Sequence, residues 1–285
     1  MPTLVSVVIP VFNAAATIAE QLAALGRQTY AGEWEIVVAD NGSTDDTAAI
    51  VDAYRSELPA LRVVDASARS GPAFARNTGA RLARGDFIAF CDADDVVADR
   101  WLEALVVAST AFDVVTGIED AERLNSETVQ SWRSPRAEGL PRGRFLPFAP
   151  TCNLGVWTTV FEKVGGFRPE YRASEDIDWS WRAQLQSYTL GLAPDAVVHY
   201  RYRSSPRGIA RQGFAAGVSS ARLYRDYREQ GLRHAEFGQV VRRWLWLLVR
   251  SPYIVSPLRR GLWIRRAAEA AGRMTGSVRF HVVAL

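Results

Sequence analysis

The chain has 285 residues, of which 48% are hydrophobic and 23% are charged, and both values are typical of soluble globular proteins. This composition excludes a disordered chain, a collagen-like chain and a disulfide-stapled scaffold. The two cysteines, Cys91 and Cys152, fit a reducing compartment without structural disulfides. No apolar run approaches the roughly 20 residues of a membrane-spanning helix, and the apolar segment 4–12 is typical of a strand and not of a signal peptide. We therefore expect a soluble, cytoplasmic α/β protein.

The net charge of +3 conceals two parts of opposite sign. Residues 1–199 carry 17 basic and 27 acidic side chains, a net charge of −10. Residues 200–285 carry 17 basic and 4 acidic side chains, a net charge of +13. A segment this basic favours an anionic partner. The candidates are a membrane surface, a nucleic acid and the acidic part of the chain itself.

The first half of the chain alternates between strand-like and helical patterns. The predicted strands are 5–9, 35–39, 61–64, 87–90 and 112–116. The predicted helices are 14–25, a helix capped by Ser43 with Asp46 three residues on, 72–83 and 101–108. This alternation predicts a mostly parallel sheet covered by helices.

Polar residues follow three of these strands, at Pro10–Asn13, Asp40–Ser43 and Asp92–Asp94. Ligands of open α/β sheets bind beyond the carboxyl ends of the strands. We therefore expect the three segments to meet at one edge of the sheet and to form a binding cleft.

The second half is less regular at first and then becomes helical. Residues 119–150 are predicted to form a long excursion, such as a flap over the site. Residues 151–203 return to order, with strands near 152–156, 189–192 and 196–202 and helices near 159–164 and 177–186. Residues 208–274 are expected to be helical, with breaks near Gly231, Ser251-Pro252 and Ser256-Pro257.

Asp92 and Asp94 form the central chemical signal. On an extended chain, residues i and i+2 point the same way, so two carboxylates at a strand end can share one hard divalent cation such as Mg²⁺ or Mn²⁺. One carboxylate can instead hold a ribose while the other holds the metal. The alternative is a solvated acidic turn or a helix cap.

Several segments together resemble the glycosyltransferase family 2 enzymes. They are Val5–Asn13, Glu35–Thr47, Gly71 with Ala75–Gly79, Asp86–Asp95, Gly165–Phe167, and Glu175–Asp178 followed by Arg182. The resemblance covers residues 4–203 and implies the GT-A fold, a Rossmann-like, mostly parallel sheet with flanking helices. It implies a catalytic domain over 1–203, with a nucleotide-sugar-binding half (1–118) and an acceptor-side half (151–203). Residues 204–285 would then be a basic, tryptophan-containing helical extension.

The resemblance also implies a donor site. Its expected members are Pro10, Val11, Phe12, Asn13, Asp40, Ser43, Gly71, Arg76, Asp92, Ala93 and Asn153. Asp40 would accept a hydrogen bond from the nucleoside base, although it can also cap the turn that follows it. Ser43 would meet an anion or cap a helix. Arg76 would face the diphosphate or base, or pair with an acidic neighbour, and Asn153 would lie beside the donor sugar.

The expected metal ligands are Asp92, Asp94 and His199, which lies about twenty residues beyond the acidic pair at Glu175 and Asp176. A strand histidine such as His199 can equally be structural. By resemblance, Asp176 is the general base that takes the proton of the acceptor hydroxyl, and Glu175 orients the acceptor or shares that role. Asp95 would cap the next segment or support the ligands from behind, and Asp178 is expected to be structural.

These expectations describe an inverting, Mn²⁺- or Mg²⁺-dependent glycosyltransferase. Its donor would be a nucleoside-diphosphate sugar, with UDP the favoured nucleotide, and its acceptor a hydroxyl on a lipid-linked or cell-envelope glycan. The alternatives are a catalytically silent nucleotide-sugar-binding scaffold and a sugar nucleotidyltransferase. The nucleotidyltransferase would normally need a basic, glycine-rich loop after the first strand, where this chain has Asn13–Ala16.

The basic extension interleaves tryptophans with arginines. Helices with such a composition lie well in an anionic membrane interface, which would place the protein peripherally on the inner face of the membrane. The alternative is that these helices pack on the acidic half of the chain. A nucleic-acid partner is not expected, because the acidic half would repel it and no recognition module is evident.

Overall fold

The computed structural model describes residues 1–58, 60–133, 139–233 and 235–284. Within these residues one eight-stranded sheet has the order β3-β2-β1-β4-β7-β6-β8-β5. The strands are β1 (Val5–Val11), β2 (Trp34–Asp40), β3 (Leu61–Asp65), β4 (Phe87–Phe90), β5 (Val96–Val97), β6 (Val114–Asp120), β7 (Leu154–Trp157) and β8 (Leu190–His199). Strand β7 runs antiparallel to β4 and β6, and β5 runs antiparallel to β8, whereas the other pairs are parallel. The prediction of a mostly parallel sheet is confirmed.

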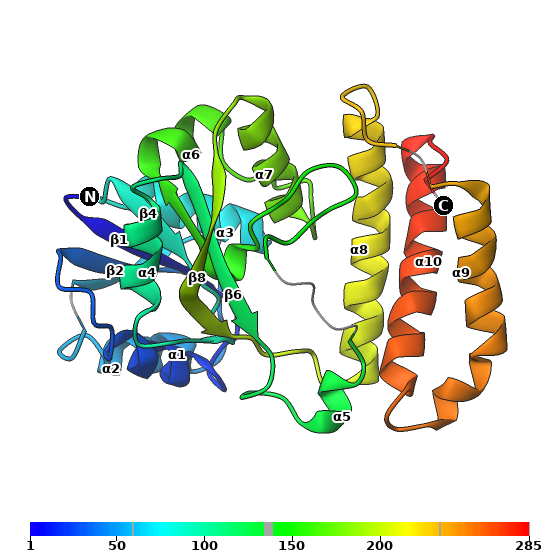
Figure 1. Ribbon diagram of the computed structural model, residues 1–285. Coiled ribbons are helices and arrows are strands. Elements are labelled where there is room, and N and C mark those ends of the chain that lie inside the picture. The colour runs from blue at the N-terminus through cyan, green and yellow to red at the C-terminus, as the bar shows by residue number, and fades with distance from the viewer. Residues whose placement is uncertain (59, 134–138, 234, 285) are drawn as a thin grey trace.

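Helices cover both faces of the sheet (Figure 1). One face is covered by α1 (Ile18–Leu25), α2 (Thr47–Ala53) and α4 (Trp101–Ala108), and the other by α3 (Pro72–Leu82), α6 (Thr158–Val164) and α7 (Glu175–Leu185). Strand β1 is nearly continuous Val and Ile because both of its faces are buried, as is usual in parallel sheets. Because these strands are buried on both faces, the sheet holds the carboxyl ends of β1, β2 and β4 in place.

Three predicted boundaries were wrong. Helix α1 starts at Ile18, because residues 14–17 form a turn in which Thr17 and Ile18 donate to the carbonyl of Ala14. Helix α2 starts at Thr47, with Asp46 before its first turn, and not near Ser43. The two strands predicted within 189–202 are a single strand, β8, and its partner β6 shifts register between Thr116 and Ile118.

The segment predicted as an excursion over 119–150 contains the end of β6 and a short helix, α5 (Glu127–Gln130). A 3-10 turn, η1 (Thr151–Asn153), leads from it into β7. Residues 134–138, which belong to the predicted flap, lie outside the described residues.

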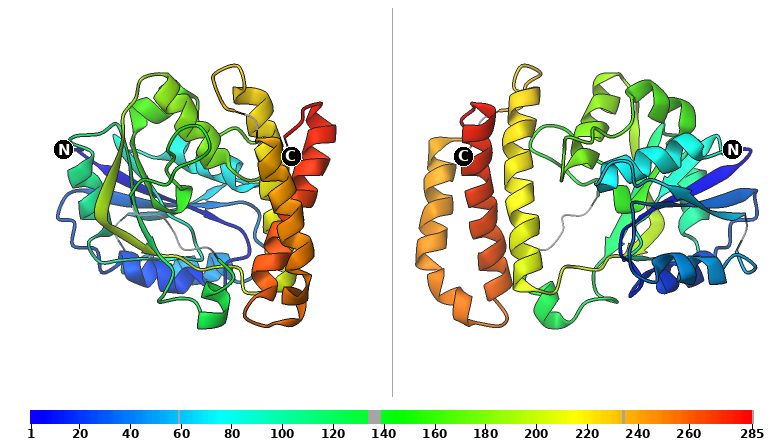
Figure 2. Two further views of the ribbon diagram at one scale, coloured as in Figure 1. Left: turned by 45° about the vertical axis from the view of Figure 1, so that its right-hand side comes forward. Right: turned by 180° about the vertical axis from the view of Figure 1, so that it is seen from behind.

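The C-terminal part is helical, and the predicted breaks are confirmed. It comprises α8 (Pro206–Tyr227), α9 (Phe237–Val249), the 3-10 turn η2 (Ser251–Val255) and α10 (Arg260–Phe280). Figures 1 and 2 show these helices side by side, with α8 next to the sheet and α9 and α10 on its far side. Among the described residues, no helix is both long and apolar enough to span a bilayer.

Glycines bring α8 and α10 into close contact. A Cβ on Gly213 of α8 would lie 2.7 Å from the carbonyl oxygen of Arg265, and a Cβ on Gly276 of α10 would lie 2.8 Å from the Cβ of Ala221. Gly217 and Gly272 face the opposite backbone even more closely, against Glu269 and Phe214. Two glycines four residues apart on each helix therefore let the two backbones approach without side chains between them.

Helix α8 also packs on α7. Leu223 and Tyr227 of α8 share a buried apolar cluster with Tyr171 and Trp181. The Tyr227 hydroxyl donates a hydrogen bond of 2.7 Å to Oδ1 of the fully buried Asp178 on α7. The C-terminal helices are therefore joined to the helix that carries the Glu175-Asp176 pair.

Candidate active site

The ends of β1 and β2 are joined by side-chain hydrogen bonds. The backbone amide of Asn13 donates to Ser43 Oγ (3.0 Å), and Asn13 Oδ1 accepts from the backbone amide of Thr44 (2.8 Å). Asn13 itself has a positive φ of 50°, which Asn tolerates better than most residues. The predicted convergence of these two segments is confirmed.

Asp40 and Ser43 form one turn. Asp40 Oδ1 accepts from the backbone amide of Ser43 (3.0 Å) and from Ser43 Oγ (2.6 Å). The expectation that Ser43 begins a helix was wrong because its hydroxyl is engaged with Asp40, four residues before α2. Asp40 therefore caps its turn, as one alternative held, and its contact with a nucleoside base stays a prediction.

The other predicted residues of this strand end differ in exposure. Pro10 is partly buried, Val11 lies in the core and Phe12 is 62% exposed. An exposed aromatic ring at a sheet edge offers a flat apolar surface to a ligand.

Asn41 at the end of β2 forms hydrogen bonds with the loop that precedes α3. The backbone amide of Gly71 donates to Asn41 Oδ1 (2.8 Å), and Asn41 Nδ2 donates to the carbonyl of Arg69 (2.9 Å). Gly71 has φ +134°, which only glycine adopts readily. Asn41 thus links the end of β2 to the helix that carries Arg76.

Three carboxylates gather just beyond β4. One oxygen from each of Asp92, Asp94 and Asp95 lies within 4.8 Å of the others. Burial, followed by the charge of Asp92, raises the pKa of both Asp94 and Asp95. Oδ2 of Asp95 is buried and has no hydrogen-bond partner in the part of the chain that the structure describes. Ala93, between the ligating candidates, is buried in the core.

This group fits a divalent cation. Carboxylate oxygens are the ligands that Mg²⁺ and Mn²⁺ prefer, and a cation would offset the repulsion that raises these pKa values. The sequence had left Asp95 as a cap or supporting residue, whereas its position makes it a full member of the acidic group.

Two arginines from the segment after β8 reach the acidic group. The backbone amide of Arg201 donates to Asp95 Oδ1 (2.7 Å), and its Nε donates to the carbonyl of Asp94 (2.9 Å). Arg203 Nη1 lies 3.0 Å from Asp94 Oδ2. The sequence analysis did not predict either contact. The feature that could have indicated them is a pair of arginines, two residues apart, just after a strand.

Arg76 joins the acidic group to the start of α7. Its Nη2 lies 2.6 Å from Asp92 Oδ1 and its Nη1 lies 2.8 Å from Glu175 Oε1. The side chain is 4% exposed. Of the two alternatives drawn from the sequence, the ion pair with acidic neighbours is therefore the one observed, and Arg76 reaches two of them.

Glu175 and Asp176 open α7, as predicted. Burial and the charge of Glu175 raise the pKa of Asp176 to about 7, while Arg76 opposes the rise. A carboxylate with a pKa near neutrality is well matched to general-base work. Asp178 is buried between Arg168 and Arg182, which agrees with its expected structural role.

Two predicted ligand contacts are engaged elsewhere. Asn153 is fully buried; its Oδ1 accepts from Trp101 Nε1 (2.9 Å) and its Nδ2 donates to the carbonyl of Ala196 (2.8 Å). The polar atoms of Asn153 therefore hold β8 and α4 together, and the expectation that this stretch of the chain lies beside the donor sugar stays a prediction. His199 Nδ1 lies 2.6 Å from Asp120 Oδ2. The acidic group found in the described part of the chain consists of Asp92, Asp94 and Asp95, without His199.

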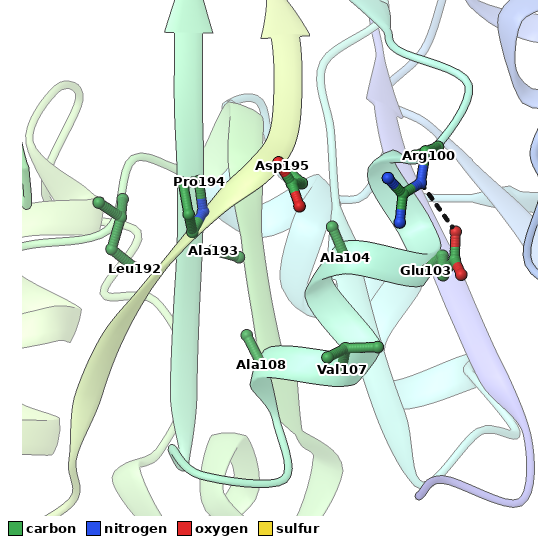
Figure 3. Close-up of a pocket in the computed structure, with 9 residues that line it drawn as sticks. All are labelled: Arg100, Glu103, Ala104, Val107, Ala108, Leu192, Ala193, Pro194 and Asp195. Carbon is green, nitrogen blue, oxygen red and sulfur yellow. Dashed lines mark hydrogen bonds and ion pairs between the residues drawn. The ribbon is translucent and has the colours of Figure 1, made fainter.

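A small cavity of about 150 Å³ lies away from these residues, between α4 and β8. Figure 3 shows its lining, including the paired Arg100 and Glu103 and the exposed Asp195. None of the predicted site residues lines it, so it plays no part in the assignment that follows.

Comparisons with known proteins identify the family of the chain. The sequence profile described as "Glycosyl transferase family 2" matches residues 6–167. The chain is 29% identical to the glycosyltransferase AglE of Haloferax volcanii over 95% of each protein. It is 25% identical to the Escherichia coli UDP-Glc:alpha-D-GlcNAc-diphosphoundecaprenol beta-1,3-glucosyltransferase WfgD, over 74% of this chain and 81% of WfgD.

A solved structure shares the fold. The mannosyltransferase PcManGT from Pyrobaculum calidifontis, in complex with GDP-Man and Mn²⁺, superposes with a TM-score of 0.66 at 19% identity, covering 96% of this chain and 87% of that one. The fold class is thereby confirmed, C-terminal helices included. Taken with the match over residues 6–167, these findings establish that the chain belongs to glycosyltransferase family 2 and is an enzyme that transfers a sugar from a nucleotide-sugar donor.

Proposed function

We propose that this enzyme is inverting and metal-dependent, and that Asp176 is its general base. The observation that carries the proposal is the chain of contacts from Glu175 through Arg76 to Asp92. It ties the start of α7, where Asp176 with its pKa of about 7 follows Glu175, to the carboxylates that fit a cation. A base on one side and a cation group on the other is the arrangement that a single displacement at a sugar carbon requires.

Asp92, Asp94 and Asp95 would hold Mn²⁺ or Mg²⁺, and the bound ion would stabilise negative charge on the departing nucleoside diphosphate. Whether His199 joins them stays a prediction. Asp176 would remove the proton from the acceptor hydroxyl, and Glu175, fixed by Arg76, would orient the acceptor. Arg203, whose side chain is 60% exposed, carries a positive charge at the edge of this group and would attract the donor diphosphate.

The nucleoside would bind at the ends of β1 and β2, with Phe12 against its base or ribose and Asp40 accepting a base N–H. We favour UDP as the nucleotide, in line with the UDP-glucose named for WfgD; GDP-Man in PcManGT makes GDP the main competitor. Residues 1–203 would form the catalytic domain, and 204–285 a helical extension of it.

The acceptor we propose is a lipid-linked glycan intermediate of a cell-envelope polysaccharide. WfgD, by its name, acts on a sugar linked to diphosphoundecaprenol. The +13 charge of residues 200–285 would favour an anionic membrane surface on the cytoplasmic side, where such a lipid would be presented.

Calorimetric binding of UDP, dTDP, GDP and CDP, each with and without Mn²⁺, tests the donor site. The wild-type protein should bind one nucleotide far better than the others, and only with Mn²⁺. Asp94→Ala should lose the Mn²⁺-dependent part, whereas Asp195→Ala, an exposed carboxylate elsewhere on the sheet, should bind as the wild type does. Equal binding by Asp94→Ala and the wild type would refute the assigned metal group.

A further inference from the structure

Helix α9 exposes its apolar side. The side chains of Leu248 and Val249 are 69% and 74% exposed. The exposed apolar residues of the helix are Val241, Trp244, Leu245, Leu248 and Val249, which recur at the three- and four-residue spacing of one helix face. A surface helix of a globular protein normally turns such a face to the core.

Arginines of α9 line a groove between this helix and α10. Gln239, Arg242, Arg243 and Trp246 line a groove of about 350 Å³ together with Arg266 and Glu269 of α10. These positions are offset from the apolar set by two residues, which is about 200° around an α-helix. The Arg266 guanidinium lies 4.2 Å from the centroid of the Trp246 ring within this groove. This side of α9 is mixed, because Leu247 is buried whereas Arg242 is exposed.

The apolar surface continues beyond α9. Ile254 and Val255 of η2 are 49% and 82% exposed, and Leu258, just after η2, is 54% exposed. Helix α9 is separated from the sheet by α8 (Figures 1 and 2). Among the described residues of the protein, these side chains remain exposed.

Positive charge surrounds the apolar surface. The guanidinium groups of Arg250 and Arg259 lie 5.1 Å and 4.9 Å from the centroid of the same ring, that of Tyr253, so two cations are held together beside Ile254 and Val255.

Acidic partners are scarce in this region. Within the described ranges, no ion pair involves Arg242, Arg243 or Arg266, and Glu269, the acid that lines the groove, pairs with Arg273 (2.8 Å). A second copy of the chain docked through the apolar surface would bring Arg250 and Arg259 of one copy near those of the other. An anionic surface would instead compensate them while burying the apolar side chains.

We propose that α9 and η2 dock on an anionic lipid bilayer. The apolar side chains lie at the boundary between headgroups and acyl chains, and the arginines beside them, Arg242, Arg250 and Arg259, bind lipid phosphates. This rests on the proposed function, which puts the acceptor at an anionic membrane surface, and names the part of the chain that binds there. Binding to a bilayer requires neither donor nor acceptor, so its failure would leave the glycosyltransferase assignment intact.

Sedimentation of the full chain with lipid vesicles tests the proposal. The wild-type protein should sediment with vesicles of phosphatidylcholine and phosphatidylglycerol and remain in solution with phosphatidylcholine alone. Leu248→Asp should abolish sedimentation. Val107→Asp, which changes an equally apolar residue that is 55% exposed on α4, should sediment as the wild type does. Arg250→Ser should weaken binding about fivefold, the effect of one arginine near an anionic surface.

The proposal is overturned if the wild-type protein does not bind anionic vesicles, or if Leu248→Asp binds as well as Val107→Asp does. It is also overturned if light scattering finds a wild-type dimer that Leu248→Asp dissociates, because the apolar surface would then be an interface between copies. Circular dichroism spectra that are identical for all variants secure the comparison, since every substituted side chain is exposed.

Discussion

A single guanidinium, that of Arg76, forms ion pairs with one carboxylate from each of the two acidic motifs of the site. Asp92 follows β4 and Glu175 opens α7, and the buried Arg76 contacts both. Buried charges of this kind are tolerated only when they are paired. Arg76 therefore holds the two motifs at a fixed separation, in addition to balancing their charge.

Arg76→Met should destabilise the protein by about 3–5 kcal/mol, because it leaves the buried Glu175 and the partly buried Asp92 without their partner. Urea unfolding followed by circular dichroism measures the free energy of unfolding. Arg27→Met is the matched control, because the pair of Arg27 and Asp99 lies on the surface, and its loss should cost only about 0–1 kcal/mol. Equal losses in the two variants would contradict the role given to Arg76.

The pKa of Asp176, raised to about 7 by burial and by Glu175, predicts a pH dependence. A general base must be ionised to accept a proton, so kcat/KM should rise with pH and level off above the pKa. Below about pH 7 it should fall about tenfold per pH unit. Steady-state rates of nucleotide release measured across this range test it. A rate that is flat from about pH 5 to about pH 8 would show that Asp176 is not the base.

At the residue scale, the sequence predicted the acidic residues better than their partners. Asp92, Asp94, Glu175 and Asp176 lie where the motifs suggested. Arg203 could not be placed, because its contact with Asp94 depends on the path of the chain after β8 and spans more than a hundred residues. The internal hydrogen bonds of Asn153 could not be predicted, because a motif position does not reveal that both ends of its amide are satisfied inside the fold.

At the element scale, α8 and α10 depend on glycine for their contact. Gly217 lies against the backbone of Glu269, and Gly272 lies against the backbone of Phe214. Glycine within a helix costs about 1 kcal/mol relative to alanine. We infer that the close packing of the two helices offsets this loss of helix propensity.

Gly217→Leu should therefore destabilise the chain by at least about 1–3 kcal/mol through overpacking, despite the better helix propensity of leucine. Gly238→Leu on α9 is the control, because nothing lies within 4 Å of a Cβ there, and it should be neutral or stabilising. Thermal unfolding of both variants provides the comparison. A Gly217→Leu protein as stable as the wild type would mean that the two helices are not packed this closely.

Strands and helices with a strong period were predictable, whereas their ends and their packing were not. Strands β1, β2 and β4 follow from continuous runs of apolar residues that are buried on both faces. The start of α2 was misplaced because Ser43 bonds to Asp40 instead of capping a helix. The contact between α8 and α10 was not evident either, since glycine spacing on one helix does not identify the partner helix.

At the scale of the whole molecule, the acidic and basic parts are joined and not merely tethered. Tyr227 of α8 donates to the buried Asp178 two residues after Asp176, and the Tyr171 hydroxyl donates to Asp226 of α8 (2.7 Å). The alternative that the extension packs on the rest of the chain is therefore observed for α8. Helix α9 keeps its apolar side exposed, so packing of α8 and membrane docking of α9 are compatible.

The central claim is that Asp176 acts as the base in sugar transfer at a site whose cation group is Asp92, Asp94 and Asp95. The most direct test compares wild type and Asp176→Asn for the release of nucleoside diphosphate from a panel of nucleotide sugars with Mn²⁺, supplied with a membrane lipid extract as the source of acceptor. Metal-dependent nucleotide binding is measured on the same samples. The account predicts a loss of about 10²–10⁴-fold in turnover with binding unchanged; turnover by Asp176→Asn at the wild-type rate would contradict it.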